Sequence, residues 1–395
     1  MENKFYAILI FGFLSHFAKA QYVTYDDYFY TQTRQPASTR AEAMGYAGVA
    51  NGGTVQETRM NAASLGVSQN PLLVEFSSSS PIFIDKRADL TFIGVGFRLH
   101  KKWFASYHEY RARIFNTILG FKKGNQSIQP NFIRENNHLL NLVYKVNSNL
   151  SFGVNGTLFD NHVDSAGLFH SFIADIGALW NKNLLNPKQT KMKESTIRLG
   201  ASISNINSAN TYYHFKGIKD TNSIYGLIRL GFAYFVSKDI GNVVYGKSAM
   251  IPKDSRTIDW LLQGQYVKFF NGLILSQKDG QNPALRWGYN LGTEISVFKV
   301  LFLRAGYRFE RRQGSTSDPL ILNYPYLKGF TFGFGIKIPF HYLTTAHLPF
   351  DLMIDVCHQK PFKWISNNIY YPTHRTTGVS LRINWFLNKS NAKNK

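Results

Sequence analysis

LFLRAGYRFE (residues 301–310) alternates strictly between two faces of the chain, with a period of two. One face carries Leu301, Leu303, Ala305, Tyr307 and Phe309, and the other carries Phe302, Arg304, Gly306, Arg308 and Glu310. FTFGFGIKI (330–338) repeats the pattern more sharply, because its odd positions are Thr, Gly, Gly and Lys and its even positions are Phe and Ile. Successive side chains of a β-strand point to opposite faces. Both stretches are therefore predicted to be strands with one apolar and one polar face.

The same alternation recurs along most of the chain after residue 70, for example in TIRLGASIS (196–204) and VSLRINW (379–385). Runs of this kind, about ten residues long and separated by polar connections, are the sequence signature of antiparallel strands. Residues 111–121 are ambiguous and could extend the third strand. The predicted strands number fourteen: 72–78, 90–98, 103–110, 138–146, 149–159, 168–180, 196–206, 226–236, 258–268, 286–298, 300–310, 328–338, 349–357 and 376–386.

Alternating strands fit either a sandwich or a transmembrane barrel. Three features favour the barrel. The strands are long enough to cross a bilayer when tilted, and the polar faces carry glycine and full charges, which suit a wet lumen. Aromatic residues make up 15% of the chain, and several tryptophans stand at predicted strand ends, as an interfacial girdle requires: Trp180, Trp260, Trp287 and Trp385. We predict an all-β fold, a transmembrane antiparallel β-barrel of about fourteen strands over residues 71–387.

The two ends of the chain carry their own signals. Residues 1–20 combine Lys4, a short apolar run and Ala18-Lys19-Ala20, which is the layout of a secretory signal peptide. Residues 388–395 form a basic tail. Export makes nucleic acid an improbable partner for a chain with a net charge of +21. Outer-membrane lipid and lipopolysaccharide phosphate are the expected anionic partners.

Catalytic signatures are thin. The sequence has no Gly-x-Ser-x-Gly elbow, no His-Glu-x-x-His and no phosphate loop. Asp355 and His358 stand three residues apart near a strand end, and a metal or hydrolytic role is the weaker interpretation of that pair. The single cysteine, Cys357, excludes an internal disulfide. We expect no enzyme, no cofactor and no metal.

The polar faces of the predicted strands carry charges that would point into the lumen. Two interpretations remain open: a structural network of ion pairs that holds an internal plug, or an electropositive path for an anionic or amphipathic cargo. The basic members are Arg198, Arg229, Arg304, Arg308, Lys337 and Arg382, and the acidic members are Asp175, Glu294, Glu310 and Asp355.

STRAEAMGYAGVANGGTVQETRMNAASLG (38–66) is rich in alanine and glycine and has few bulky residues. Such a slim backbone could pass close to a lumen wall, so we predict an N-terminal plug over residues 21–70, with a flexible linker as the alternative. Its charged residues could pair with the inward charges of the barrel. The plug residues singled out are Arg40, Glu42, Met44, Gly45, Gly48 and Asn61.

The order of these motifs resembles the FadL-like outer-membrane barrels, and within them the PorV-like branch of type IX secretion in Bacteroidetes. The resemblance runs from RAEAMGYAGVAN (40–51) and NAASLG (61–66) through ADIGALW (174–180) to KGFTFGFGIKI (328–338). One departure is MNAAS (60–64), where that family usually has Trp-Asn-Pro-Ala. Residues also continue beyond Phe386, whereas such barrels commonly stop at a terminal aromatic.

This resemblance implies a non-enzymatic component of protein secretion in the outer membrane of a Gram-negative, Bacteroidetes-type cell. Such a protein would receive or shuttle secreted proteins, and its partners would be those proteins and the secretion machinery. The alternatives are a FadL-type channel for hydrophobic small molecules such as fatty acids, with a hydrophobic ligand in the lumen, and a structural outer-membrane protein.

Overall fold

The computed structural model describes most of the predicted barrel and the segment before it. The described residues are 38–79, 82–83, 86–115, 121–123, 126–128, 132–163, 167–184, 192–206, 210–215, 218–223, 226–240, 257–270, 287–311, 326–340, 350–359, 364–366, 369–371 and 376–385. The predicted signal peptide and basic tail lie outside them. Within the described part, no helix is both long and apolar enough to cross a membrane.

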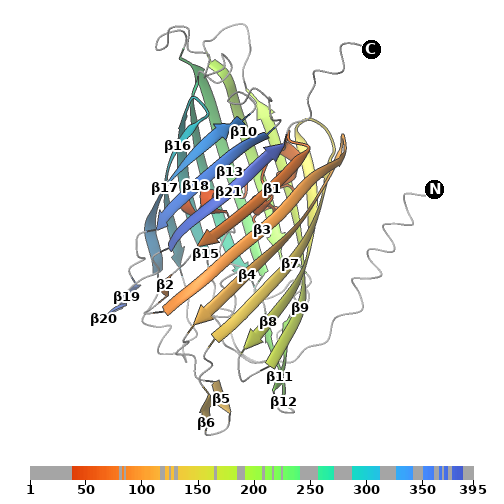
Figure 1. The fold of residues 1–395 in the computed structure, drawn as a ribbon, viewed down its shortest axis with the longest axis vertical. Helices are drawn as coiled ribbons and strands as arrows, with labels where there is room; N and C mark the ends of the chain where they lie inside the picture. Colours follow the sequence, from red (N-terminus) through yellow and green to blue (C-terminus); the bar gives the residue numbers. More distant parts are fainter. Residues whose placement is uncertain are drawn as a thin grey trace, which may run out of the picture.

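Fourteen antiparallel strands form a closed barrel (Figure 1). Each strand pairs with its neighbours along the chain, and β1 closes the ring by pairing with both β21 and β3. The strands are β1 (Leu72–Ser79), β3 (Lys86–His100), β4 (Trp103–Phe115), β7 (Phe132–Lys145), β8 (Leu150–Val163), β9 (Gly167–Asn183), β10 (Met192–Ser204), β13 (Gly226–Asp239), β14 (Thr257–Phe270), β15 (Trp287–Val297), β16 (Leu301–Arg311), β17 (Tyr326–Pro339), β18 (Phe350–Gln359) and β21 (Thr376–Trp385).

The predicted strand count is therefore confirmed, and each strand falls where the alternation placed it. Several strands are longer than predicted, and β4 takes in the ambiguous residues as far as Phe115. Some predicted loops also contain short strands: β2 (Ile82–Phe83), which pairs with β3, and the hairpins β5 (Phe121–Lys123)–β6 (Gln126–Ile128), β11 (Asn210–Phe215)–β12 (Ile218–Ser223) and β19 (Trp364–Ser366)–β20 (Ile369–Tyr371).

Side-chain alternation separates an apolar exterior from a mixed interior. On β17, Phe330 and Phe332 are 58% and 43% exposed, whereas Thr331 between them is fully buried. A contiguous exposed apolar surface of this extent is typical of a membrane-facing protein. The large exposed side chains encircle the barrel and include Phe76, Ile93, Leu140, Leu158, Leu199, Leu230, Leu291, Leu303, Phe332 and Leu381.

Tight turns join strand pairs at one end of the barrel. Between β7 and β8, the Asn147 side chain accepts hydrogen bonds from the backbone N–H groups of Asn149 and Leu150, at 2.8 and 2.9 Å, which is how asparagine stabilises a turn. Between β15 and β16, the N–H of Val300 bonds to the carbonyl oxygen of Val297, and the two central residues of this turn, Phe298 and Lys299, have left-handed φ angles of 58° and 54°. We call this end the short-turn rim.

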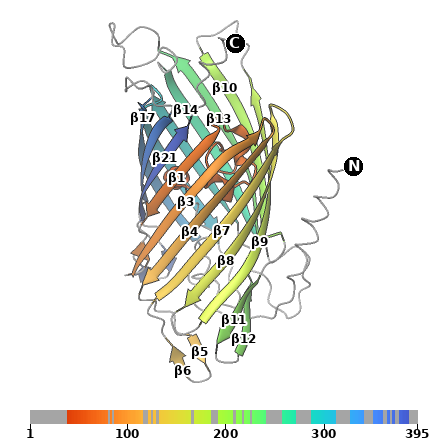
Figure 2. The same ribbon diagram turned by 45° about the vertical axis from the view of Figure 1, so that its right-hand side comes forward.

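The chain before β1 is described from Ser38 and contains three short helices: α3 (Thr39–Ala43), η2 (Gln56–Arg59) and η3 (Ser64–Val67). We call residues 38–68 the N-terminal segment. Almost all of its residues are buried, and it lies inside the ring of strands (Figures 1 and 2).

Candidate functional site

The N-terminal segment begins with a capped helix. Ser38 has extended backbone angles, and its hydroxyl accepts a hydrogen bond from the N–H of Ala41 at 3.1 Å, as an N-cap does. α3 combines the charged residues Arg40 and Glu42 with Thr39, Ala41 and Ala43, and it packs against β17 and β18. Ala43 lies so close to Gly333 of β17 that a Cβ atom on Gly333 would overlap the Ala43 methyl group.

The chain reverses after α3 at Gly45, where φ is +68°, a value that glycine adopts without strain. At this reversal the backbone passes directly against β16, because a Cβ atom on Gly306 would overlap the backbone nitrogen of Gly45. A second close passage occurs at β10, where a Cβ on Gly200 would overlap the carbonyl oxygen of Val49. Glycine on the inner face of the strands thus creates the room that the segment occupies.

Neutral polar side chains of the strands hold the backbone of the segment around the barrel. Thr331 of β17 accepts a hydrogen bond from the N–H of Gly45 at 2.8 Å, and on the opposite wall Asn141 of β7 donates to the carbonyl oxygen of Ala62 at 2.8 Å. Bonds of this kind satisfy backbone groups that would otherwise be buried without partners. Further neutral strand side chains bonded to the segment backbone are Ser151, Asn155, Ser202, Gln263, Gln265 and Asn290. The carboxyl group of Glu75 also accepts from the N–H groups of Val55 and Gln56, at 3.0 and 2.9 Å.

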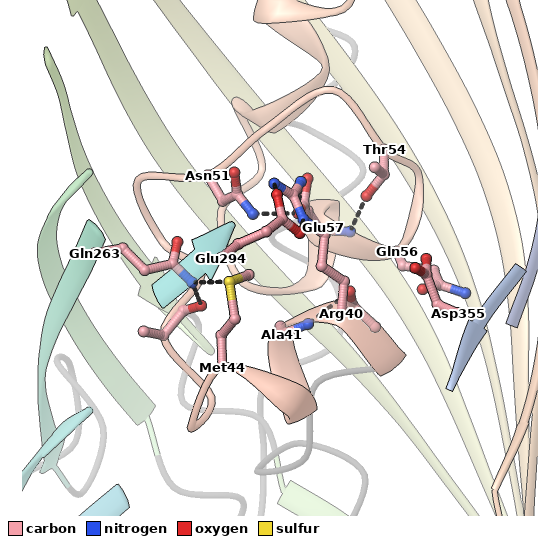
Figure 3. Close-up of polar contacts among 12 residues, drawn as sticks. Arg40, Ala41, Met44, Asn51, Thr54, Gln56, Glu57, Gln263, Glu294 and Asp355 are labelled. Atoms are coloured by element: carbon pink, nitrogen blue, oxygen red, sulfur yellow. Dashed lines mark hydrogen bonds and ion pairs between the residues drawn. The ribbon is translucent and has the colours of Figure 1, made fainter. Parts of the chain in front are cut away.

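A buried ion network joins α3 to the wall formed by β15, β16 and β18 (Figure 3). The Arg40 guanidinium donates to both carboxylate oxygens of Glu294, at 2.9 and 2.7 Å. Arg304 donates to Glu294 at 2.5 Å and to Asp355 at 2.6 Å. Burial opposes the charge of Arg40, but the carboxylates of Glu294 and Glu57 outweigh it and raise the pKa of the guanidinium. The network therefore stays charged.

A carboxyl group of α3 lies next to the single cysteine. The Cys357 thiol donates to a carboxyl oxygen of Glu42 at 3.1 Å. Burial raises the pKa of Glu42 to about 7, and the thiol hydrogen bond offsets only part of that rise. This carboxyl group is the one member of α3 that titrates near neutral pH.

Three of the predicted inward charges, Glu294, Arg304 and Asp355, converge with Arg40 in the ion network. The others lie elsewhere along the inner wall, in separate contacts. Two of them form ion pairs: Arg308 pairs with Glu310 at 2.8 Å and stacks over the Tyr46 ring, and Lys337 pairs with Asp351 at 2.6 Å. Arg198 donates to Asn181, Arg229 donates to Ser204, and Asp175 accepts from Asn155 and from the Asn205 N–H. Arg382 lies opposite Glu75 in the β1–β21 register.

The predicted residues of the segment each make a specific contact. Met44 is buried, with its sulfur 3.3 Å from Nε2 of Gln263. The N–H of Gly48 donates to Gln265 at 3.1 Å. Asn61 donates to the carbonyl oxygens of Val49 and Ala178, at 2.7 and 2.9 Å, so its side chain links two parts of the chain. The sequence interpretation missed the neutral strand residues, although their inward positions follow from the same alternation.

Asp355 and His358 do not form a common site. They stand on opposite faces of β18, because Asp355 is buried and ion-paired with Arg304 whereas His358 falls on the outward-facing parity of the strand. No group of three or more potential metal ligands occurs in the described part of the chain.

One sector of the inner wall gathers large buried apolar side chains, with Glu75, His108 and Glu135 buried on the same strands. The side chains of Val55 and Leu65 pack against β3, where a Cβ atom on Gly94 or Gly96 would lie 2.8 Å from the Val55 methyl groups. We call this sector the apolar seam. It runs along β1, β3, β4 and β7 on both sides of the segment and comprises Val55, Leu65, Leu73, Leu90, Phe92, Phe104, Tyr110, Ala112 and Val143.

No protein-family model and no curated protein matches the chain in sequence. Solved structures resemble it in shape. The Pseudomonas putida toluene transporter TodX is 12% identical, with 87% of this chain and 96% of that chain covered and a TM-score of 0.44. The CymD monoaromatic hydrocarbon channel is 10% identical (88% and 97% covered, TM-score 0.45). A Pseudomonas aeruginosa FadL homologue is 11% identical (88% and 97% covered, TM-score 0.45).

Proposed function

We propose that this protein is an outer-membrane transport barrel for small hydrophobic or amphipathic molecules. In this proposal the N-terminal segment, within the predicted plug of residues 21–70, closes the lumen. The apolar seam is the path by which a substrate passes that closure. The FadL-type alternative inferred from the sequence thus takes precedence over the PorV-like secretion function.

The closure is supported by the distribution of contacts around the ring. The segment is bonded to β17 through Gly45, to β14 through Gly48 and to β7 through Ala62, so its fixed points are spread over opposite walls. Such an arrangement fits a barrel that does not conduct ions or folded proteins through an open pore.

The observation that carries the proposal is the difference between the two sides of the segment. On the side of β15, β16 and β18 it is fixed by charge-assisted hydrogen bonds of Arg40, which are among the strongest contacts in proteins. On the side of β3 the side chains of Val55 and Leu65 make apolar contacts. The backbone N–H of Val55 is held by Glu75 of β1 at 3.0 Å, so in this proposal only the two side chains turn aside while the backbone stays bonded. A hydrophobic molecule would replace the lost apolar contacts.

A reversible lock tests this path. Val55→Cys and Gly94→Cys place two thiols across the seam, in a Cys357→Ser background that removes the native thiol. The matched control, Ala43→Cys with Gly333→Cys, joins the segment to the ionic side. A Cβ atom at residue 94 would lie 2.8 Å from a methyl carbon of Val55, and one at residue 333 would overlap the Ala43 methyl carbon, so both pairs must separate slightly to reach the Cβ–Cβ span of a disulfide. Heat-modifiable mobility of the reduced variants shows that each pair folds before uptake is measured. The readout is uptake of a labelled long-chain fatty acid and of a labelled monoaromatic hydrocarbon by Gram-negative cells that lack their own hydrophobic-uptake barrel.

We expect oxidation of the seam pair to reduce uptake to the level of cells without the protein, and reduction to restore it. The control pair should leave uptake unchanged in both states. If neither compound enters through the unlocked protein, transport of hydrophobic molecules is excluded. Co-purification of secreted proteins in that case would support the secretion function that the PorV-like resemblance implies. If oxidation of the control pair abolishes uptake as well, the path is not specific to the apolar seam and that part of the proposal is wrong.

A further inference from the structure

The short-turn rim carries an excess of lysine. Among the residues that the structure describes, seven lysines lie at the strand ends and turns of this rim: Lys101, Lys102, Lys145, Lys182, Lys193, Lys238 and Lys299. The described carboxylates at the surface of the rim are Glu194 and Asp239. Asp259 and Asp351 are at the same end but are buried and bonded inside the barrel.

Few of these lysines are neutralised by the protein. Lys193 pairs with Asp239 at 3.1 Å. Across the described residues, none of the other six has a carboxylate within ion-pair distance. Like charges that have no carboxylate partner among the described residues repel one another, so an external anion near these six lysines would relieve the repulsion.

Tryptophan accompanies lysine at three points of the outer surface near this rim. Lys102 is directly followed by Trp103, which is 40% exposed and stacks with Tyr144 at 4.7 Å between ring centroids. Lys182 follows Trp180 by two residues, so both project from the same face of β9. Each lysine lies on the rim side of its tryptophan.

The third pair spans two strands. Lys238 of β13 is paired with Ile258 of β14. Ile258 and Trp260 are two residues apart and face outward on the same side of β14, and Trp260 is 42% exposed. Tryptophan rings of membrane proteins lie at the level of the lipid carbonyl and headgroup region. A lysine one step further out extends its ammonium group to the phosphate level.

We propose that the short-turn rim is a binding surface for anionic phospholipid headgroups, with Lys102, Lys182 and Lys238 as the phosphate-binding groups beside Trp103, Trp180 and Trp260. The surface sets the depth of the barrel in the leaflet that the short turns face. It is independent of any substrate path through the lumen.

Lipid selection can be measured with the tryptophans themselves. The full-length protein is reconstituted in bilayers of phosphatidylcholine that contain a minor fraction of brominated phosphatidylglycerol or brominated phosphatidylcholine, because bromine quenches neighbouring tryptophan fluorescence. We expect stronger quenching by the brominated phosphatidylglycerol. The triple variant K102Q/K182Q/K238Q should lose this preference, by on the order of a hundredfold in relative affinity given the contribution of each of the three lysines near an anionic surface.

Two controls separate charge from structure. K102R/K182R/K238R keeps the charge and should keep the preference, and K268Q makes the same change at the opposite end of β14, where it should have no effect. Heat-modifiable mobility in gels confirms that each variant is folded. Equal quenching by the two brominated lipids, or a preference that survives the glutamine triple, overturns the proposal.

Free phosphate is the other source of the same chemistry. Sodium phosphate is added at the ionic strength of a sodium chloride control, and we expect both salts to weaken the preference equally, by screening. If phosphate abolishes it at a concentration where chloride does not, the rim binds the inorganic ion and the lipid proposal is wrong.

Discussion

Arg40 donates two hydrogen bonds to Glu294, a residue 254 positions further along the chain, at 2.9 and 2.7 Å. Breaking a buried ion pair typically costs about 3–5 kcal/mol, and here the lower end, about 3 kcal/mol, applies because Arg40 keeps Glu57 at 3.6 Å and Arg304 keeps Asp355 at 2.6 Å. We therefore expect Glu294→Gln to lower the free energy of unfolding by that amount, measured by urea titration of tryptophan fluorescence in detergent. The exposed pair Lys193–Asp239 provides the control: Lys193→Gln should cost at most about 1 kcal/mol. Equal losses in the two variants would show that the buried network does not anchor the segment.

Gly306→Ala tests the close passage of the segment at β16. The added Cβ would overlap the backbone of Gly45, so the segment cannot keep its place. We expect a loss of several kcal/mol or failure to form the heat-modifiable barrel. In Gly156→Ala the added Cβ would meet only the Phe172 ring, at 3.2 Å, and that variant should fold. A stable Gly306→Ala barrel with native protease resistance of the segment would contradict the structure.

Glu42 predicts a pH dependence of stability. Its pKa is about 7 in the folded protein against 4.5 when unperturbed, so between these values the unfolded chain releases a proton that the folded chain retains. The stabilising contribution of the protonated carboxyl group amounts to a few kcal/mol. It is complete below pH 4.5, falls as the pH rises and is lost above pH 7. The observable is the difference in unfolding free energy between the wild type and Glu42→Gln from pH 4 to 8. A difference that does not change with pH would refute the assignment.

Leu65→Ala should loosen the apolar seam without touching a hydrogen bond. Truncation of a buried leucine costs about 2–5 kcal/mol, and the vacated space should raise the rate of hydrophobe uptake. Leu303→Ala is the matched change on the outer surface, where the side chain is 61% exposed, and uptake should stay at the wild-type rate. Slower uptake in Leu65→Ala would mean that the leucine guides the substrate rather than obstructs it.

The strands were predictable because each has one face toward an apolar surface and one toward the interior. In β17 the alternation of phenylalanine with threonine and glycine survives without interruption, so its period decides both strand and orientation. The boundaries were less predictable, because a strand ends where its hydrogen-bonded neighbour ends. β4 continues to Phe115 because β7, which begins at Phe132, pairs with it that far. The sequence of residues 111–115 alone does not indicate where this pairing ends.

The candidate site was predictable in its charges but not in their pairing. Arg304 and Glu294 are inward by parity, yet their contact depends on the register of β15 against β16, which alternation does not fix. Partners such as Gln265 were missed because a neutral amide in a lumen carries no charge signal, although it bonds the backbone of Gly48 and Val49 at 3.1 and 3.0 Å. The role of the segment as a plug stays a prediction.

The long reach of the N-terminal segment has a consequence for biogenesis. Glu42 contacts Cys357, a residue 315 positions away, and Gly45 contacts Thr331, 286 positions away. The part of the chain that is synthesised first therefore completes its contacts only when the last strands arrive. Contacts of such high sequence separation make folding slow. Burial of the N-terminal segment thus depends on strands that are made last, and we expect a factor that inserts this barrel to keep the ring open until residues 38–68 are inside.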